Sequence, residues 1–316
     1  MQPAQVAKLV ESAALAVLLP CRPISSIFEE MADADFRAGL ASALGSEIER
    51  FSRVSGGDIN DAWDVRLSGG RRVFVKYNLH TPPKMFAAEA AGLTFLREGL
   101  RADSPLVIPD VLHVGHNFLV LEFLERRAGA DESEALGRGL ALLHAASADE
   151  FGAAAPNFIG TLAQVNESRE HWADFFRDMR LEAQLSLPGA QRLLPSGAKR
   201  RFELLFKKLE QLLGPEEPPA RVHGDLWGGN SFFSTRGPAI FDPAAYAGHR
   251  EVDLAMMRLF GGFSERTFAA YEETYPLVPG HLERVPIYQL YPLLVHVNLF
   301  GAGYVGSVED ALRRVT

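Results

Sequence analysis

The sequence predicts a two-lobed α+β protein, with a small β-rich N-terminal lobe and a larger, mainly helical C-terminal lobe. Its 316 residues are many for one compact core and suit two lobes with a cleft between them. Strand-like patterns are concentrated in the first part of the chain, and helix-like spacing of apolar residues dominates the rest. We therefore expect an appended segment at 1–30, an N-terminal lobe at 31–125 and a C-terminal lobe at 126–316.

The composition excludes several classes of protein. Hydrophobic residues make up 47% of the chain and charged residues 23%, which predicts a folded core. A net charge of −8 argues against a nucleic-acid partner, because neutralising phosphates requires an excess of Lys and Arg. The lone cysteine, Cys21, cannot form an internal disulfide and fits a reducing cytoplasm. The apolar run at 13–19 is too short to span a membrane, and a signal peptide is the alternative to an appended segment.

The predicted N-terminal lobe combines β structure with one amphipathic helix. Residues 48–78 contain turn residues and the β-branched, aromatic run Arg72-Val-Phe-Val-Lys76, which together predict a hairpin with a glycine-rich bend. Apolar residues at helical spacing predict a helix at 84–99, and Gly99 is placed to end it. The run Phe118-Leu-Val-Leu-Glu-Phe-Leu124 predicts a buried strand before the lobe boundary near residue 126.

The predicted C-terminal lobe is mostly helical. Helix-like apolar spacing occurs in four segments, 134–146, 169–187, 197–213 and 253–260. Prolines at 215–219 break the pattern, and a compact β-like insert follows at 221–242.

That insert contains the residues most suggestive of chemistry, His223-Gly-Asp-Leu-Trp-Gly-Gly-Asn230 and then Ile240-Phe-Asp242-Pro. Phosphoryl transfer needs a carboxylate that accepts the proton of an attacking hydroxyl, and oxygen ligands that hold Mg²⁺ against the nucleotide phosphates. Asp225 can supply the base, and Asn230 with Asp242 the metal ligands. Each residue alone is more often a turn or cap residue. The five-residue spacing from Asp225 to Asn230 matches the catalytic loop of protein kinases, so the joint pattern favours a protein-kinase-like fold.

The N-terminal lobe offers an independent test of this hypothesis. Lys76 ends an apolar strand, where a charge could reach nucleotide phosphates, and Glu89 lies beside the inward face of the next helix. A Lys76–Glu89 ion pair would satisfy both charges. In the alternative, Lys76 extends from the strand end into water and Glu89 flanks the helix.

Two further segments are candidates for nucleotide contacts. Gly56 and Gly57 allow close approach of backbone to phosphates, although an ordinary hairpin turn explains them nearly as well. Glu122, Phe123 and Leu124 lie at the lobe junction, where backbone groups could bind an adenine edge; a plain buried strand is the alternative.

These residues resemble the fructosamine (ketosamine) kinase family, whose catalytic loop is similar to that of aminoglycoside phosphotransferases. Trp227 is the distinguishing residue of the loop. Other matching segments are Gly56-Gly-Asp-Ile-Asn60, Phe74-Val-Lys76, Leu136-Gly-Arg-Gly-Leu-Ala-Leu-Leu-His144, Asn157-Phe-Ile-Gly160 and Asp242-Pro-Ala-Ala-Tyr-Ala-Gly-His-Arg-Glu-Val-Asp-Leu-Ala-Met256.

The resemblance implies an ATP- and Mg²⁺-dependent kinase of the 3-hydroxyl of ketosamines, the sugar adducts of amines. It implies that Asp225 is the base, that Asn230 and Asp242 hold Mg²⁺, and that Lys76, supported by Glu89, contacts phosphate. Trp227 would pack against the sugar ring. We also expect Asp253 to accept backbone N–H groups of the catalytic loop.

The chain departs from the family pattern in two places. Asp58 stands where some members carry a cysteine, so redox-linked dimerisation is not expected, and a monomer is favoured. The family usually begins near Met31, so residues 1–30 have no counterpart. Three other functions stay open: the same fold acting on an aminoglycoside, choline or another sugar; a pseudokinase that binds partners; and, least favoured, a metal hydrolase built on His223 and Asp225.

Overall fold

The computed structural model describes residues 36–54, 60–129 and 131–316, and the chain divides into two units, Met1–Glu49 and Arg50–Thr316. In the first unit, residues 36–44 are helical. The predictions for residues 1–30 lie outside the described residues.

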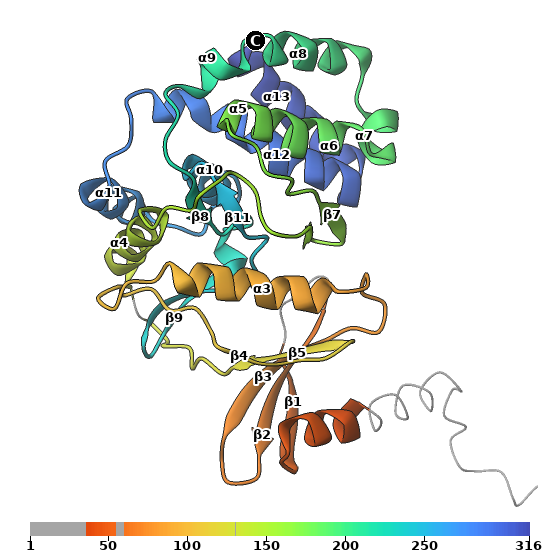
Figure 1. Ribbon diagram of the computed structural model, residues 1–316, viewed down its shortest axis with the longest axis vertical. Coiled ribbons are helices and arrows are strands. Elements are labelled where there is room, and N and C mark those ends of the chain that lie inside the picture. Colours follow the sequence, from red (N-terminus) through yellow and green to blue (C-terminus); the bar gives the residue numbers. More distant parts are fainter. Residues whose placement is uncertain (1–35, 55–59, 130) are drawn as a thin grey trace, which may run out of the picture. The chain divides into compact units, whose positions relative to one another are not determined.

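The β-rich part is a five-stranded sheet in the order β1-β2-β3-β5-β4 (Figure 1). Its strands are β1 (Ile48–Val54), β2 (Asp61–Leu67), β3 (Arg72–Tyr77), β4 (Val111–Val114) and β5 (Phe118–Glu122). The expected β structure at 48–78 and the strand at 118–124 are therefore present, although the first forms three strands. In β3, Val73 and Val75 are fully buried, because alternate residues of a strand face the same side. Lys76 lies in this strand, opposite Ala62 and Leu119.

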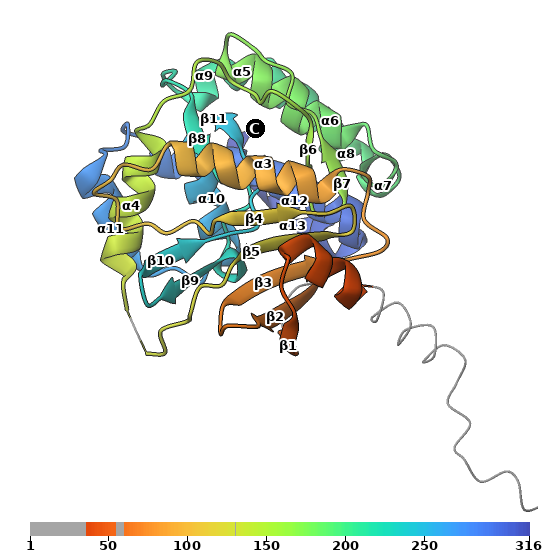
Figure 2. The ribbon, with the colours of Figure 1, turned by 60° about the horizontal axis from the view of Figure 1, so that its bottom comes forward.

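Helix α3 (Met85–Glu98) is the predicted helix at 84–99, and Gly99 follows its last turn. It buries Phe86, Leu93 and Leu96, the apolar face that the spacing indicated. Within the second unit, α3 lies between the sheet and the helical part, packing against β4 and β5 and against β6 and β8 (Figures 1 and 2). Helix α3 thus lies next to both the sheet and strand β8, where the insert at 221–242 begins. Because this insert contains the predicted catalytic residues, we call it the catalytic insert.

The rest of the second unit is mainly helical, as predicted. Its helices are α4 (Ser133–His144), α5 (Trp172–Phe175), the π-helical segment η1 (Phe176–Glu182), α6 (Ala183–Leu185), α7 (Pro188–Leu193), α8 (Ser196–Phe206), α9 (Leu209–Leu213), α10 (Glu251–Phe260), α11 (Glu265–Thr274), α12 (His281–Phe300) and α13 (Val305–Val315), with short 3-10 turns η2 (Gly228–Asn230) and η3 (Ala302–Tyr304). Three two-stranded antiparallel sheets complete it: β6 (Asn157–Ile159) with β7 (Leu162–Gln164), β8 (Ala220–Val222) with β11 (Tyr246–Gly248), and β9 (Ser231–Ser234) with β10 (Gly237–Ile240).

Two clusters of buried apolar residues form the core of this unit. One surrounds α12 and gathers aromatic side chains such as Trp172, Phe175 and Tyr288. The other joins α3, β5 and α4 to Leu226 and Ile240, which flank the predicted catalytic residues. The second cluster contains residues from both sides of residue 126, so it does not mark a boundary there. The lobe boundary near residue 126 therefore remains a prediction.

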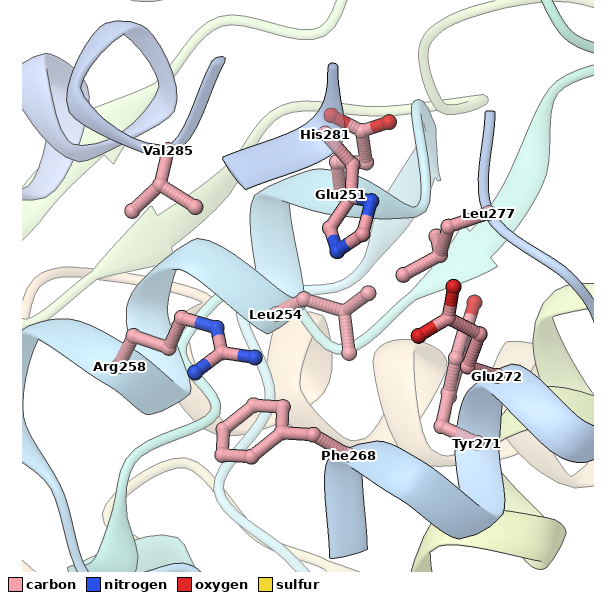
Figure 3. A pocket seen from close by; sticks show the side chains of 9 residues that line it. All are labelled: Glu251, Leu254, Arg258, Phe268, Tyr271, Glu272, Leu277, His281 and Val285. Atoms are coloured by element: carbon pink, nitrogen blue, oxygen red, sulfur yellow. The ribbon is translucent and has the colours of Figure 1, made fainter. Parts of the chain in front are cut away.

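Two recesses lie within the helical part. A cavity of about 20 Å³, room for a single water molecule, is lined by residues of α10, α11 and α12, and Figure 3 shows His281 beside Leu254 with Arg258 next to Phe268. A wider groove of about 670 Å³ runs past Asp149, Glu170 and Glu216. Neither contains a predicted site residue. No helix among the described residues is long and apolar enough to cross a bilayer.

Candidate active site

The predicted catalytic loop follows strand β8 within the insert, and Asp253 of α10 fixes the first two residues of that loop. Asp253 Oδ2 accepts the His223 N–H at 2.7 Å, and Oδ1 accepts the Gly224 N–H at 2.8 Å. The expectation that Asp253 accepts backbone hydrogen bonds from this loop is confirmed. Gly224 has a φ of 79°, and a Cβ there would lie 2.3 Å from the carbonyl oxygen of Ala244. Only glycine therefore fits between the two segments.

His223 links this loop to the segment that carries Asp242. Its Nε2 donates to the Phe241 carbonyl at 2.9 Å, which leaves Nδ1 to accept the Asp225 N–H at 3.3 Å. Burial lowers the pKa of His223, so the neutral ring keeps this tautomer at physiological pH. The two bonds place Asp225 next to the Asp242 segment.

Asn230 orients the carboxylate of Asp225. Its Nδ2 donates to the Asp225 carbonyl at 2.9 Å and to Asp225 Oδ2 at 3.1 Å, and lies 3.5 Å from the Asp242 carbonyl. Burial, with the nearby charge of Asp242, raises the pKa of Asp225 to about 7. A carboxylate with a pKa near neutrality is well suited to accept a proton from a hydroxyl group.

The ion pair expected between Lys76 and Glu89 forms, and Lys76 makes a second one. Lys76 Nζ donates to both oxygens of Glu89, at 2.9 and 2.8 Å, and also to Asp242 Oδ1. The Lys76 and Glu89 side chains are buried, whereas Asp242 keeps 35% of its side-chain surface exposed. Strand β3 and helix α3 thus bring their charges to the catalytic insert.

The three charges shift one another's pKa values. Although burial opposes its charge, the two carboxylates raise the pKa of Lys76. Burial raises the pKa of Glu89, and Lys76 opposes that effect. At Asp242 burial acts in the same sense, but Lys76 outweighs it and holds the pKa below its usual value. Asp242 is therefore ionised at neutral pH.

The donor set of Asn230 and Asp242 fits Mg²⁺. The amide nitrogen of Asn230 bonds to Asp225 and lies near the Asp242 carbonyl, so its Oδ1 is left free of these bonds as an oxygen ligand. Mg²⁺ is commonly held by one or two protein oxygens together with substrate phosphates and water. No group of three or more His, Cys, Asp or Glu side chains suited to a metal ion occurs among the described residues.

The predicted adenine segment begins at Glu122, the last residue of strand β5, and continues beyond it. The Glu122 N–H donates to the Asp110 carbonyl at 2.8 Å, and the Glu122 carboxylate binds Arg236 at 2.9 Å. Phe123 and Leu124 lie beyond the paired register of β5, so the ladder does not use their backbone groups. The Arg72 guanidinium lies 3.7 Å from the centre of the Phe123 ring. Gly56 and Gly57 lie outside the described residues.

Trp227 is 39% exposed at the start of η2. A Cβ on Gly229 would lie 2.2 Å from the Trp227 ring, so the indole covers that glycine. Trp227 itself follows Asp225 by two positions. The loop that carries the proposed base therefore also carries a partly exposed aromatic ring.

Sequence reasoning missed a group of rings near this loop, formed by Phe260, His296, Phe300 and Tyr304. The ring centres of Phe260 and His296 lie 4.6 Å apart, and that of His296 lies 5.2 Å from the ring centre of Phe300 and 4.8 Å from that of Tyr304. The turn after Phe260 touches the catalytic loop, since a Cβ on Gly262 would lie 2.7 Å from Gly228 Cα. No spacing in the sequence links α12 to this loop.

It also missed His144, the last residue of α4. His144 Nε2 lies 3.1 Å from Asp253 Oδ2, and Nδ1 lies 2.9 Å from the Tyr271 hydroxyl. His144 is the last residue of the segment Leu136–His144, one of those on which the family resemblance is based. That position in the sequence was the one sign that it could matter to the site.

A β-rich part, a helical part and this set of polar residues define a protein-kinase-like phosphotransferase, and solved structures agree. A crystal structure of a candidate fructosamine-3-kinase from Thermobifida fusca matches with a TM-score of 0.81 and 36% identity, over 88% of this chain and 97% of that chain. An aminoglycoside phosphotransferase solved with AMP-PNP and hygromycin B shares the fold, with a TM-score of 0.59, 18% identity and coverage of 88% of this chain and 98% of that chain.

The chain belongs to the fructosamine kinase family, whose model matches residues 34–316. A probable ketoamine kinase from Thermus thermophilus is 42% identical over 261 residues, 82% of this chain and 91% of that protein. A probable ketoamine kinase from Synechocystis is 40% identical over 281 residues, 84% of this chain and 90% of that protein. The predictions of fold, family and ATP-dependent phosphotransferase activity are confirmed.

Proposed function

We propose that this protein uses MgATP to phosphorylate the 3-hydroxyl of ketosamines. One observation carries the proposal: Lys76 contacts Asp242, 166 positions away in the chain, next to the loop of Asp225 and Asn230. The residues proposed as phosphate-binding cation, metal ligand and base therefore lie close together, which supports the proposal for a member of the fructosamine kinase family.

In this mechanism Asp225 accepts the proton of the attacking hydroxyl, and Asn230 keeps its carboxylate in one orientation. Lys76 contacts the nucleotide phosphates and Glu89 holds Lys76 in place. Asn230 and Asp242 would hold Mg²⁺, which would supply neutralisation of the charge that develops on the phosphates. Transfer is in line, without a covalent enzyme intermediate.

The remaining predicted residues take binding roles. Backbone groups of the Glu122–Phe123–Leu124 segment bind the adenine edge, and Gly56 and Gly57 approach the phosphates. Trp227 packs against the sugar, since aromatic faces offer a flat apolar surface to the ring. The phosphorylated adduct then loses its amine, which makes the reaction a repair of glycated amines in the cytoplasm.

An acceptor panel tests the substrate. ATP consumption is measured side by side with a ribulosamine, a fructosamine, an aminoglycoside and choline. We expect turnover with the ketosamines alone. Turnover of an aminoglycoside or choline with silent ketosamines would replace the proposed acceptor.

Replacing Asp225 tests the proposed base. Asp225→Asn keeps the size of the side chain but cannot accept the proton, so turnover should fall by about a hundredfold or more while ATP still binds. Asp149→Asn, on an exposed residue of the wider groove, is the control. Near-full activity of Asp225→Asn would mean that another group is the base.

A further inference from the structure

We propose that three buried amide side chains, Asn157, Gln164 and Asn166, position the segment that follows Asp242 and so set the affinity for the metal–nucleotide complex. We call them the amide cluster. The inference rests on the proposed role of Asp242 as a metal ligand. In this proposal the three amides act by positioning the Asp242 segment, because none of them contacts the reacting groups.

The amide cluster binds the backbone directly after Asp242. Asn157 Nδ2 donates to the Ala245 carbonyl at 2.8 Å, and Gln164 Nε2 donates to the Ala244 carbonyl at 3.0 Å. Asn157 Oδ1 in turn accepts from Gln164 Nε2 at 2.7 Å and from Asn166 Nδ2 at 2.8 Å. The three side chains are at most 8% exposed, so water does not compete for these bonds.

Two hydrogen-bond donors at the edge of the amide cluster, Arg180 and Tyr291, fix which way its amide groups are turned. Arg180, 0% exposed on η1, donates from Nη2 to Asn166 Oδ1 at 2.8 Å, and a guanidinium can only donate. Tyr291 of α12 donates its hydroxyl to Gln164 Oε1. Asn166 and Gln164 therefore present their oxygens to Arg180 and Tyr291, and both donate from nitrogen to Asn157 Oδ1. The nitrogens of Gln164 and Asn157 in turn face the backbone carbonyls of Ala244 and Ala245, which can only accept. The chain of bonds is consistent from both ends, so the amides cannot flip without breaking it.

Arg180 is itself held firmly. Its guanidinium lies 3.9 Å from the centre of the Tyr246 ring and 4.6 Å from that of Phe175, and Nη1 donates to the Val165 carbonyl at 2.7 Å. Tyr246 ends the same segment that starts at Asp242. The cation thus anchors the amide cluster and the end of the segment together.

The geometry of Asp242 explains why such support matters. Asp242 has a φ of 58°, in the left-handed region that costs a residue other than glycine about 1 kcal/mol or more. A strained conformation persists where its surroundings determine it from several sides. Here Gly224 lies against the Ala244 carbonyl, and Gly92 of α3 lies against Pro243. The amide cluster adds hydrogen bonds to the carbonyls of Ala244 and Ala245.

A matched pair of variants tests the proposal. Gln164→Met removes the bonds to the Ala244 carbonyl and to Asn157 while keeping the side-chain length. Gln184→Met is the control, because Gln184 is equally buried, at 2% exposed, but bonds to Asn298 of α12. Both variants should lose stability, since each removes a buried hydrogen-bonding amide.

Binding of Mn²⁺ in the presence of a non-hydrolysable ATP analogue is followed by electron paramagnetic resonance. Hydrogen–deuterium exchange of residues 242–248 is measured in parallel. We expect Gln164→Met to weaken Mn²⁺ binding by about tenfold, the loss of one or two net hydrogen bonds, and to speed exchange in 242–248. Gln184→Met should change neither. Should Gln164→Met fail to fold, Tyr291→Phe removes only the hydroxyl donor and should weaken Mn²⁺ binding by about threefold.

Wild-type affinity in Gln164→Met, or in Tyr291→Phe where that variant is used, overturns the inference. So does an equal loss in Gln184→Met. The assay contains no acceptor, so a failure of the acceptor panel with normal Mn²⁺ binding would remove the proposed substrate and leave the amide cluster's role intact.

Discussion

Three charges meet at Lys76, in surroundings where burial disfavours each one alone. The pairing of Lys76 with Glu89 could be predicted from the sequence, because the end of an apolar strand and the inward face of the next helix leave two charges that need each other. The contact with Asp242 could not, because nothing in local patterning relates residues 166 positions apart. Only the recognised order of motifs suggested it.

Because an isolated buried charge is costly, removing one partner of the Lys76–Glu89 pair should destabilise the protein more than removing both. Lys76→Met leaves Glu89 buried without a cation and should destabilise the protein by about 3 kcal/mol. Adding Glu89→Gln removes the isolated carboxylate, so the double variant should be the more stable of the two, although both are inactive. Denaturant unfolding of the wild type, both single variants and the double variant completes the cycle. Equal stability of Lys76→Met and the double variant would show that the pair is not coupled.

The buried side chain of His249 should make the folded protein less stable at acidic pH. Burial, opposed by Glu217 and aided by Arg250, lowers the pKa of His249 from 6.5 to about 4. The folded protein then keeps His249 neutral while the unfolded chain protonates it, so stability is lost as pH falls from about 6.5 towards 4. By pH 5 the loss is about 2 kcal/mol.

His249→Asn provides the comparison, because its Oδ1 can still accept the Glu251 N–H that Nδ1 accepts at 3.3 Å. The variant loses the stacking on Tyr288 and should be less stable at pH 7.5. Its stability should nevertheless fall less between pH 7.5 and 5 than that of the wild type, measured by urea midpoints. An identical fall in both proteins would assign the acid sensitivity to other groups.

Among the helices and strands, features that depend on residues within one segment could be predicted from the sequence. Features that depend on how side chains of distant segments meet could not. Helix α3 was predicted because its apolar spacing and Gly99 both act within one segment. The π-helical turn at Phe176–Glu182 was not, since its residues have ordinary helix-like spacing. The amide cluster was also invisible, because its members meet only when β6, β7 and the Asp242 segment fold together.

The contact between α4 and α11 depends on a glycine. A Cβ on Gly137 of α4 would lie 2.1 Å from the backbone oxygen of Thr267, and backbone cannot move aside as a flexible side chain can. Gly137→Ala should therefore push the helices apart and destabilise the protein by about 1–3 kcal/mol, despite the better helix propensity of alanine. In Gly197→Ala, on α8 with nothing within 4 Å, only propensity acts, and stability should be unchanged or higher. Thermal unfolding of the two variants separates packing from propensity, and equal melting temperatures would contradict the close approach.

At the scale of the whole second unit, the site is assembled from elements of the sheet, α3 and the helical part. The buried cluster that contains Leu226 and Ile240 also contains Leu93 of α3 and Leu119 of β5. Apolar packing therefore holds the strands and α3 against the catalytic insert, and the charges at Lys76 and Asp242 meet on that support. The order of these elements could be predicted from motifs, but their packing depends on contacts between distant segments.

A bound nucleotide that contacts the sheet, α3 and the helical part should raise the free energy of unfolding of the protein. If Asn230 and Asp242 hold Mg²⁺ as proposed, this stabilisation should depend on Mg²⁺. Saturation with a non-hydrolysable ATP analogue and Mg²⁺ at about a hundred times Kd contributes about 2.7 kcal/mol, a rise of about 5 °C in Tm for a domain of this size. Chelating the metal should remove most of that rise, because the phosphates then bear uncompensated charge beside Asp225 and Asp242. Asn230→Ala should show a smaller metal-dependent rise with an unchanged metal-free one, since it removes an oxygen ligand and leaves the adenine contacts alone. Equal stabilisation with and without Mg²⁺ in the wild type would contradict the assignment of Asn230 and Asp242 as metal ligands.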